Sequence, residues 1–153
     1  MTELITAPLP DAFGHSIFCD DIRFEMDGKI TYVGGYMGSM FVKTGFPATL
    51  PKFCIAVHFM QKEAASGLKL HIFLPGDTDE KASIQADIEE PPQSIGPSEF
   101  ILIGVNAVFT PLLIEQPGMI KVRILRNGVL HRVGSLNVAP ASEAPTSAPL
   151  QPS

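Results

Sequence analysis

Phe18–Val42 reads FCDDIRFEMDGKITYVGGYMGSMFV, two apolar runs that meet at Asp27-Gly28. An Asp-Gly pair between two alternating runs is a strong signal for a β-hairpin, because both central positions of the tight turn need a positive φ angle. With a two-residue loop, Ile22 pairs with Val33, and one face of the hairpin consists of Ile22, Phe24 and Val33. The stretch therefore predicts an antiparallel sheet built on this hairpin.

The same register directs Asp20 toward the core, opposite Gly35. In one interpretation, Asp20 is a buried carboxylate with a partner that satisfies it. In the other, a bulge at Gly34-Gly35 changes which side chains face inward. Adjacent glycines in a strand commonly mark a bulge, so the bulge is the favoured interpretation.

A second hairpin signal is Asn127-Gly128, which lies between two further apolar runs. A two-residue loop at this position places Arg123 directly opposite Arg132. Like charges in opposed positions are unfavourable. A bulge near Gly134, or a longer loop, is the expected relief.

The rest of the chain alternates apolar and polar residues between Pro and Gly turns, and no segment has a sustained helical period. Strands are predicted at Lys52–Lys62, Leu68–Leu74, Ser83–Glu89, Glu99–Phe109, Met119–Leu125 and Val129–Val138. With the first hairpin these make about eight strands, which predicts an all-β antiparallel β-sandwich. A closed β-barrel is the alternative.

The β-sandwich domain is predicted to span residues 14–138. It follows an irregular lead-in at 1–13 and precedes a Pro/Ala/Ser-rich tail at 139–153, whose composition predicts disorder. Near its end, Pro111–Val138 holds an apolar segment, a Pro-Gly corner, an alternating strand, an Asn-Gly turn and a final strand. This order resembles the last strands of immunoglobulin-like sandwiches and implies an immunoglobulin-like arrangement.

Composition limits the classes of function. The chain has 153 residues, which suits one domain, with 45% hydrophobic and 18% charged residues. A net charge of −5 argues against binding to a phosphate backbone, which needs clustered Lys and Arg. There is no recognisable secretory signal and no apolar run long enough to span a membrane. A cytoplasmic protein with neither a nucleic-acid nor a membrane partner is expected.

The cysteines, Cys19 and Cys54, are expected to stay reduced in that compartment. A bridge between them is the alternative, and it would close a loop of about 35 residues and add about 3–4 kcal/mol in the chain-entropy model. Two cysteines alone do not make a zinc site, and no cofactor is predicted.

The first hairpin also carries a motif, FCDDIR-x-E-x-x-GK, in Phe18–Arg23, Glu25 and Gly28-Lys29. A Gly-x-Tyr-x-Gly pattern around Tyr36 and an LPK at Leu50–Lys52 follow it. Together these residues resemble an uncharacterised family of small bacterial all-β proteins. The resemblance implies an all-β fold, and it implies no mechanism because the family is uncharacterised.

Ionisable residues are densest in the first hairpin. Asp20, Asp21 and Glu25 offer oxygen ligands for a hard cation. Successive residues of a strand point to opposite faces, however, so these carboxylates do not converge without a bulge. A solvated charged edge with an Arg23–Glu25 or Arg23–Tyr32 contact is the favoured interpretation.

Aromatic and methionine side chains surround the glycines of the second hairpin strand, and such residues suit a protein interface. The alternative is that they fill a second core face. The predicted binding surface consists of Asp20, Asp21, Arg23, Glu25, Tyr32, Tyr36 and Met37.

No metal site is predicted, and His58 and His71 are weak candidates. If Lys52–Lys62 pairs with Leu68–Leu74, His58 lies opposite His71, where two imidazoles could share a metal or act as a pH switch. Two separate surface histidines are the simpler interpretation. No catalytic residue is predicted, because G-x-S-x-G is absent from the sequence, and Cys54 and His58 lie about 13 Å apart on one strand.

These observations predict a non-catalytic binding or structural module rather than an enzyme. It would act through protein–protein contacts, by self-association or as an accessory subunit of a phage-derived or bacterial assembly. A small metal-binding or ligand-binding β-sandwich is the alternative, although no small-molecule ligand can be identified. A hydrolase is the least favoured hypothesis.

Overall fold

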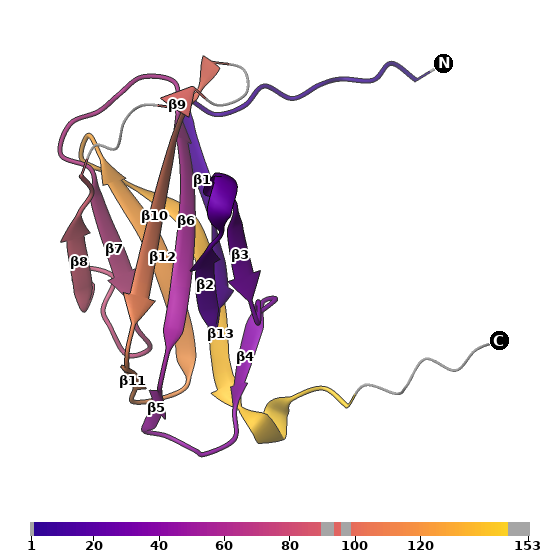
Figure 1. The fold of residues 1–153 in the computed structure, drawn as a ribbon, viewed down its shortest axis with the longest axis vertical. Helices are drawn as coiled ribbons and strands as arrows, with labels where there is room; N and C mark the ends of the chain where they lie inside the picture. The colour runs from indigo at the N-terminus through magenta and orange to yellow at the C-terminus, as the bar shows by residue number, and fades with distance from the viewer. Residues whose placement is uncertain (1, 90–93, 96–98, 147–153) are drawn as a thin grey trace.

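The computed structural model describes residues 2–89, 94–95 and 99–146 (Figure 1). Its regular elements are β-strands and single turns of 3-10 helix, as at Met26–Gly28 between β2 and β3 and at Ala141–Glu143 after the last strand. No α-helix occurs in the described ranges, and the sheets there do not close into a barrel. The predicted all-β, mostly antiparallel sandwich is confirmed.

One layer is a four-stranded sheet in the order β1-β6-β10-β9. Its strands are β1 (Ala12–Cys19), β6 (Phe53–Gln61), β10 (Ile101–Phe109) and β9 (Ser94–Ile95). The alternation predicted for β6 is confirmed, because its core-facing residues are Phe53, Ile55, Val57 and Phe59. This strand is the centre of the layer, with β1 on one side and β10 on the other.

The other layer is a five-stranded sheet in the order β4-β13-β12-β7-β8. Its strands are β4 (Ser39–Val42), β13 (Val129–Pro140), β12 (Gly118–Arg126), β7 (Lys69–Phe73) and β8 (Ile84–Asp87). All neighbours in it are antiparallel except β4 and β13, which are parallel. Two small sheets complete the described fold: β2 (Asp21–Phe24) with β3 (Ile30–Val33), and β5 (Ala48–Leu50) with β11 (Leu112–Ile114).

The core lies between the two large sheets. Its largest fully buried side chains include Phe53, Phe59, Ile55, Ile72, Ile120, Ile124 and Leu136. They alternate along their strands with side chains that face outward, which is the pattern of a sandwich. Each such burial stabilises the fold by about 1.5–3 kcal/mol, so this interior holds both layers in place.

The two layers approach each other along one side, where β1 runs next to β13. Ser16 Oγ donates a hydrogen bond to the Val133 carbonyl at 2.7 Å. Gly134 has a φ angle of 147°, and a Cβ atom there would lie 2.8 Å from the Ser16 Cβ. Glycine is therefore required where the bulged strand β13 passes β1.

The first hairpin forms, but its register differs from the predicted one. Asp27 and Gly28 have positive φ angles of 74° and 75°, as predicted, yet the loop is the three-residue turn Met26–Gly28. Ile22 therefore pairs with Tyr32 in place of Val33. A slip of one residue exchanges the two faces of a strand, so Tyr32 faces inward beside Ile22.

Phe24, which was predicted to be a core residue, is 68% exposed at the end of this hairpin. The predicted bulge at Gly34-Gly35 is also wrong, because Phe18 pairs with Tyr36 in the same register that pairs Asp21 with Val33. The three-residue loop, and not a bulge, changes which side chains of the hairpin face inward. The hairpin packs on the outer face of β1 and β6, and this is why β6 is buried on both sides.

The second hairpin is confirmed as a two-residue loop at Asn127-Gly128, with Arg123 directly opposite Arg132. The predicted bulge at Gly134 is also present, since the register shifts immediately beyond Arg123. The bulge lies next to the arginine pair, between Arg132 and Gly134 on β13, so Arg123 and Arg132 stay directly opposed.

The strands extend slightly past the predicted domain limits, from Ala12 at the start of β1 to Pro140 at the end of β13. Part of the predicted tail, 147–153, lies outside the described residues. Within the described residues, no helix is long and apolar enough to cross a membrane.

Candidate functional site

The binding surface predicted in the first hairpin divides into separate groups. Asp21 accepts a hydrogen bond from Lys52 Nζ at 2.6 Å and lies 3.4 Å from Arg23 Nε. The bond from Lys52 is the largest cause that holds the pKa of Asp21 below its usual value. Arg23 therefore contacts Asp21, in place of the predicted contact with Glu25 or Tyr32. Ion pairs this exposed contribute little to stability.

Asp20 is exposed, which excludes the buried-carboxylate interpretation. The Tyr36 hydroxyl donates a hydrogen bond to its carboxylate. Burial, followed by this hydrogen bond, raises the pKa of Tyr36 to about 12. Gly34 lies against the same carboxylate with a φ angle of 66°, so a side chain there would collide with Asp20. Met37 is 95% exposed beyond this group.

The predicted pairing of His58 with His71 is wrong, because the two histidines belong to different sheets. His58 on β6 lies opposite His15 on β1, with ring centroids 5.0 Å apart. The Tyr32 hydroxyl lies 3.3 Å from His58 Nε2, and His58 Nδ1 is buried without a hydrogen-bond partner. Burial, followed by the charge of His15, lowers the pKa of His58.

These histidines do not assemble a metal centre. Across the residues that the structure describes, no three His, Cys, Asp or Glu side chains gather as metal ligands. Two imidazoles alone bind a metal weakly. His58 is thus a half-buried histidine between Tyr32 of the first hairpin and the exposed His15.

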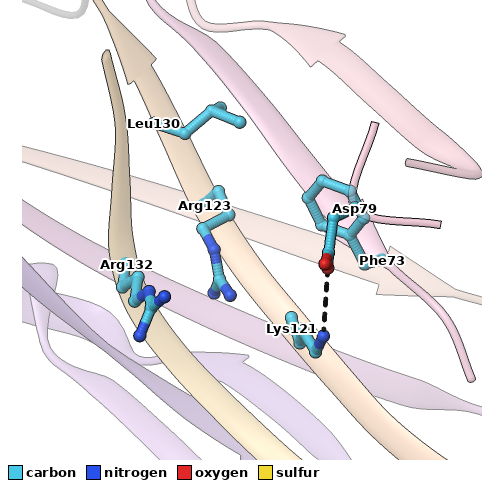
Figure 2. Close-up of a pocket in the computed structure, with 6 residues that line it drawn as sticks. All are labelled: Phe73, Asp79, Lys121, Arg123, Leu130 and Arg132. Atoms are coloured by element: carbon cyan, nitrogen blue, oxygen red, sulfur yellow. Dashed lines mark hydrogen bonds and ion pairs between the residues drawn. The ribbon is translucent and has the colours of Figure 1, made fainter. Parts of the chain in front are cut away.

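A different group of charges gathers on the outer face of the five-stranded sheet, at the centre of Figure 2. Lys121, Arg123 and Arg132, here called the basic face, come from β12 and β13. They line a cavity of about 410 Å³ together with Phe73, Asp79 and Leu130. A shallower hollow of about 230 Å³ continues from the same three cations toward Met119 and Ser135.

The acidic neighbour of the basic face is Asp79, which pairs with Lys121 and whose charge also acts on Arg123. Asp79, in the turn between β7 and β8, lies 3.4 Å from Lys121 Nζ (Figure 2). Neither Arg123 nor Arg132 has a carboxylate within ion-pair distance among the described residues. Arg123 Nη1 donates to the Val122 carbonyl at 3.2 Å. Burial, followed by the charge of Arg132, lowers the pKa of Arg123.

The surroundings of the two arginines are partly apolar. Arg123 lies over the Phe73 ring, 6.0 Å from its centroid, and Leu130 forms a wall of the cavity. His71 lies opposite Arg123 on β7, and its Nε2 is buried without a hydrogen-bond partner. The cavity combines two arginines that have no ion pair with apolar carbon, which is chemistry suited to holding an anion.

The sequence contains one signal for the basic face, which was not recognised as a binding site. The Asn127-Gly128 turn places Arg123 opposite Arg132 in the strand register. We expected the repulsion to be relieved by a bulge, whereas the structure keeps the two charges together. Lys121 and Asp79 could not be found from the sequence, because they meet through a turn contact between distant segments.

Comparison with known proteins gives a family and no function. Searches of curated proteins and of solved structures found no match to the chain. A family model described as "Family of unknown function (DUF6941)" matches residues 15–139, which covers nearly all of the sandwich. The predicted membership in an uncharacterised family is confirmed, whereas its bacterial origin stays a prediction. The chain belongs to the family of unknown function DUF6941.

Proposed function

We propose that this protein is a non-catalytic binding domain whose basic face holds an acidic segment of a partner protein. The observation that carries the proposal is the pair Arg123 and Arg132, directly opposed and without a carboxylate within ion-pair distance in the described part of the chain. Opposed like charges are unfavourable in a free sheet. An anion bound between them removes that repulsion and gains charge-assisted hydrogen bonds.

The charge distribution supports an acidic protein segment over a nucleic acid. The whole chain carries a net charge of −5, so attraction for an anion is limited to the immediate surroundings of the basic face. The basic face has only three cations, one of them already paired with Asp79. A few carboxylates match this number, whereas a phosphate backbone needs a broad basic surface.

The apolar residues around the cations also favour a protein partner. Leu130 and Met119 are 40% and 38% exposed beside the arginines. Arginine, methionine and aromatic side chains are enriched in protein interfaces. In an acidic segment with apolar residues between its carboxylates, the carboxylates would bind the arginines and the apolar residues would pack against Leu130 and Met119.

The test is the binding of a fluorescent glutamate-rich peptide to the full chain, measured by anisotropy. The double variant Arg123→Gln/Arg132→Gln is expected to lose at least about tenfold in affinity, because it removes two charge-assisted contacts. Lys29→Gln/Lys43→Gln, which changes two exposed residues outside the basic face, is the charge-matched control and is expected to bind like the wild type. Equal losses in both variants, or equally tight binding of duplex DNA, would contradict the proposal.

The immunoglobulin-like strand order, the cytoplasmic location and the role in an assembly stay predictions. A partner that brings an acidic segment to the basic face is compatible with an accessory subunit of an assembly.

A further inference from the structure

Cys19 and Cys54 lie directly opposite each other on β1 and β6, and both are free, fully buried thiols. Opposed residues on antiparallel strands have Cα atoms about 4.5–5.5 Å apart, which is within the range that a disulfide spans. Their side chains share one face of the sheet. Burial, followed by the charge of Cys54, raises the pKa of Cys19.

The first hairpin covers this thiol pair. Ile22 packs against both cysteines in one buried cluster, and Tyr32 borders it. Cys54 Sγ donates a weak hydrogen bond to the Asp20 carbonyl at 3.8 Å. The thiolate is the reactive form of cysteine, and burial raises the pKa of both thiols, so the covered pair is inert. If the first hairpin moves away from β1 and β6, Ile22 moves with it and both sulfur atoms become exposed.

We propose that Cys19 and Cys54 form a site of reversible thiol oxidation, which closes an intramolecular disulfide when the hairpin lifts in the presence of a low-molecular-weight disulfide. One cysteine thiolate attacks the small disulfide, forms a mixed disulfide and releases one small thiol. The other thiolate attacks the protein sulfur of that mixed disulfide and releases the second small thiol. The two protein thiols are oxidised, and their protons and electrons reduce the small disulfide to two thiols.

The geometry predicts a bond that is easily reduced. Opposed Cβ atoms on neighbouring strands lie about 4.5–5.5 Å apart, whereas a disulfide holds them about 3.5–4.5 Å apart. Closing the bond therefore draws β1 toward β6. A disulfide under such strain has a more oxidising potential and returns readily to the thiols.

The test incubates the full chain, folded, with glutathione disulfide, then alkylates the remaining thiols and maps the peptides. Wild type is expected to lose both thiols together, to yield a linked Cys19–Cys54 peptide in a monomer, and to recover both thiols with dithiothreitol. At least one of the variants Cys19→Ser and Cys54→Ser is expected to stop at a glutathione adduct. Thiols that stay reduced, a stable adduct on wild type or an intermolecular bridge would overturn the proposal.

A pair of variants tests the role of the hairpin. Ile22→Ala removes the cover and is expected to accelerate the loss of both thiols by about tenfold, because local opening becomes easier. Ile114→Ala removes a buried side chain of β11, away from the thiols, and is expected to change the rate much less. Equal acceleration in both variants would show that the thiols react only through general unfolding, and it would overturn the role of the hairpin.

Discussion

Arg123 lies directly opposite Arg132 on neighbouring strands, and neither guanidinium has a carboxylate within ion-pair distance in the described ranges. The bulge that follows them at Gly134 leaves this pairing intact. Both cations line a cavity of about 410 Å³ on the outer face of the five-stranded sheet. The proposed binding of an acidic segment rests on this relationship.

Replacing Arg132 with glutamine should stabilise the free protein and weaken binding at the same time. Relief of the opposed charges is expected to raise the free energy of unfolding by about 0.5 kcal/mol. The affinity for the glutamate-rich peptide should fall, because one cation is lost. Urea unfolding and anisotropy measure the two effects, with Lys43→Gln as the control. If Arg132→Gln destabilises the free protein, the arginine has a structural partner, contrary to this account.

Replacing Asp79 with asparagine should strengthen binding. The change frees Lys121 and removes the acidic wall of the cavity, so the local positive potential rises. Affinity for the same peptide is expected to increase about threefold at low salt and less at high salt. Asp11→Asn is the matched control, because Asp11 pairs with Lys62 at 3.6 Å outside the basic face. An unchanged or lower affinity of Asp79→Asn would argue against the cavity as the site.

Gly34→Ala should be clearly destabilising. Gly34 has a φ angle of 66°, and an added Cβ atom would collide with the Asp20 carboxylate that Tyr36 holds. A loss of about 1–3 kcal/mol in the free energy of unfolding is expected. Gly35→Ala is the neighbouring control, since no atom lies within 4 Å of its added Cβ. Similar losses in both variants would contradict the close approach at Gly34.

Stability should fall with decreasing pH through His58. Its pKa is lowered from 6.5 by burial and then by the charge of His15. The unfolded chain therefore binds the proton more tightly than the folded one. The stability that neutral His58 provides is complete above about pH 6.5 and is lost as the pH falls toward the lower folded-state pKa.

The variant His15→Gln should reduce this loss, because it removes one of the two causes and leaves burial. Urea unfolding at about pH 7.5 and about pH 5.5 measures the difference in stability. His131→Gln, on β13, is the control for removal of a histidine elsewhere. If the loss of unfolding free energy between the two pH values is the same in His15→Gln as in the wild type, burial alone lowers the pKa of His58.

The two hairpins show which features of a β-turn can be predicted from the sequence. Asn127-Gly128 gave the correct two-residue loop and register, whereas Asp27-Gly28 lies in a three-residue turn despite its positive φ angles. The dipeptide specifies the turn conformation but not the number of residues in the loop. In the first hairpin, packing of Ile22 and Tyr32 on the four-stranded sheet accompanies the slipped register.

The alternation within the long strands was readable from the sequence, whereas the choice of partner strands was not. The alternation predicted for β6 and β7 was correct, but these strands lie in opposite layers, so His58 lies opposite His15. Pairing between distant strands depends on the whole packing of the sandwich. The site was predicted in the first hairpin, where charges are dense in sequence, although the second hairpin already placed Arg123 opposite Arg132. The approach of Phe73 and Asp79 to this pair depends on the pairing of distant strands.

Chemical-shift mapping of the labelled full chain with the glutamate-rich peptide tests the central claim most directly. The account predicts that the largest shifts fall on Lys121, Arg123, Leu130 and Arg132, and that they disappear in Arg123→Gln/Arg132→Gln. Shifts confined to the first hairpin, or no shifts at peptide concentrations that saturate a millimolar site, would contradict it.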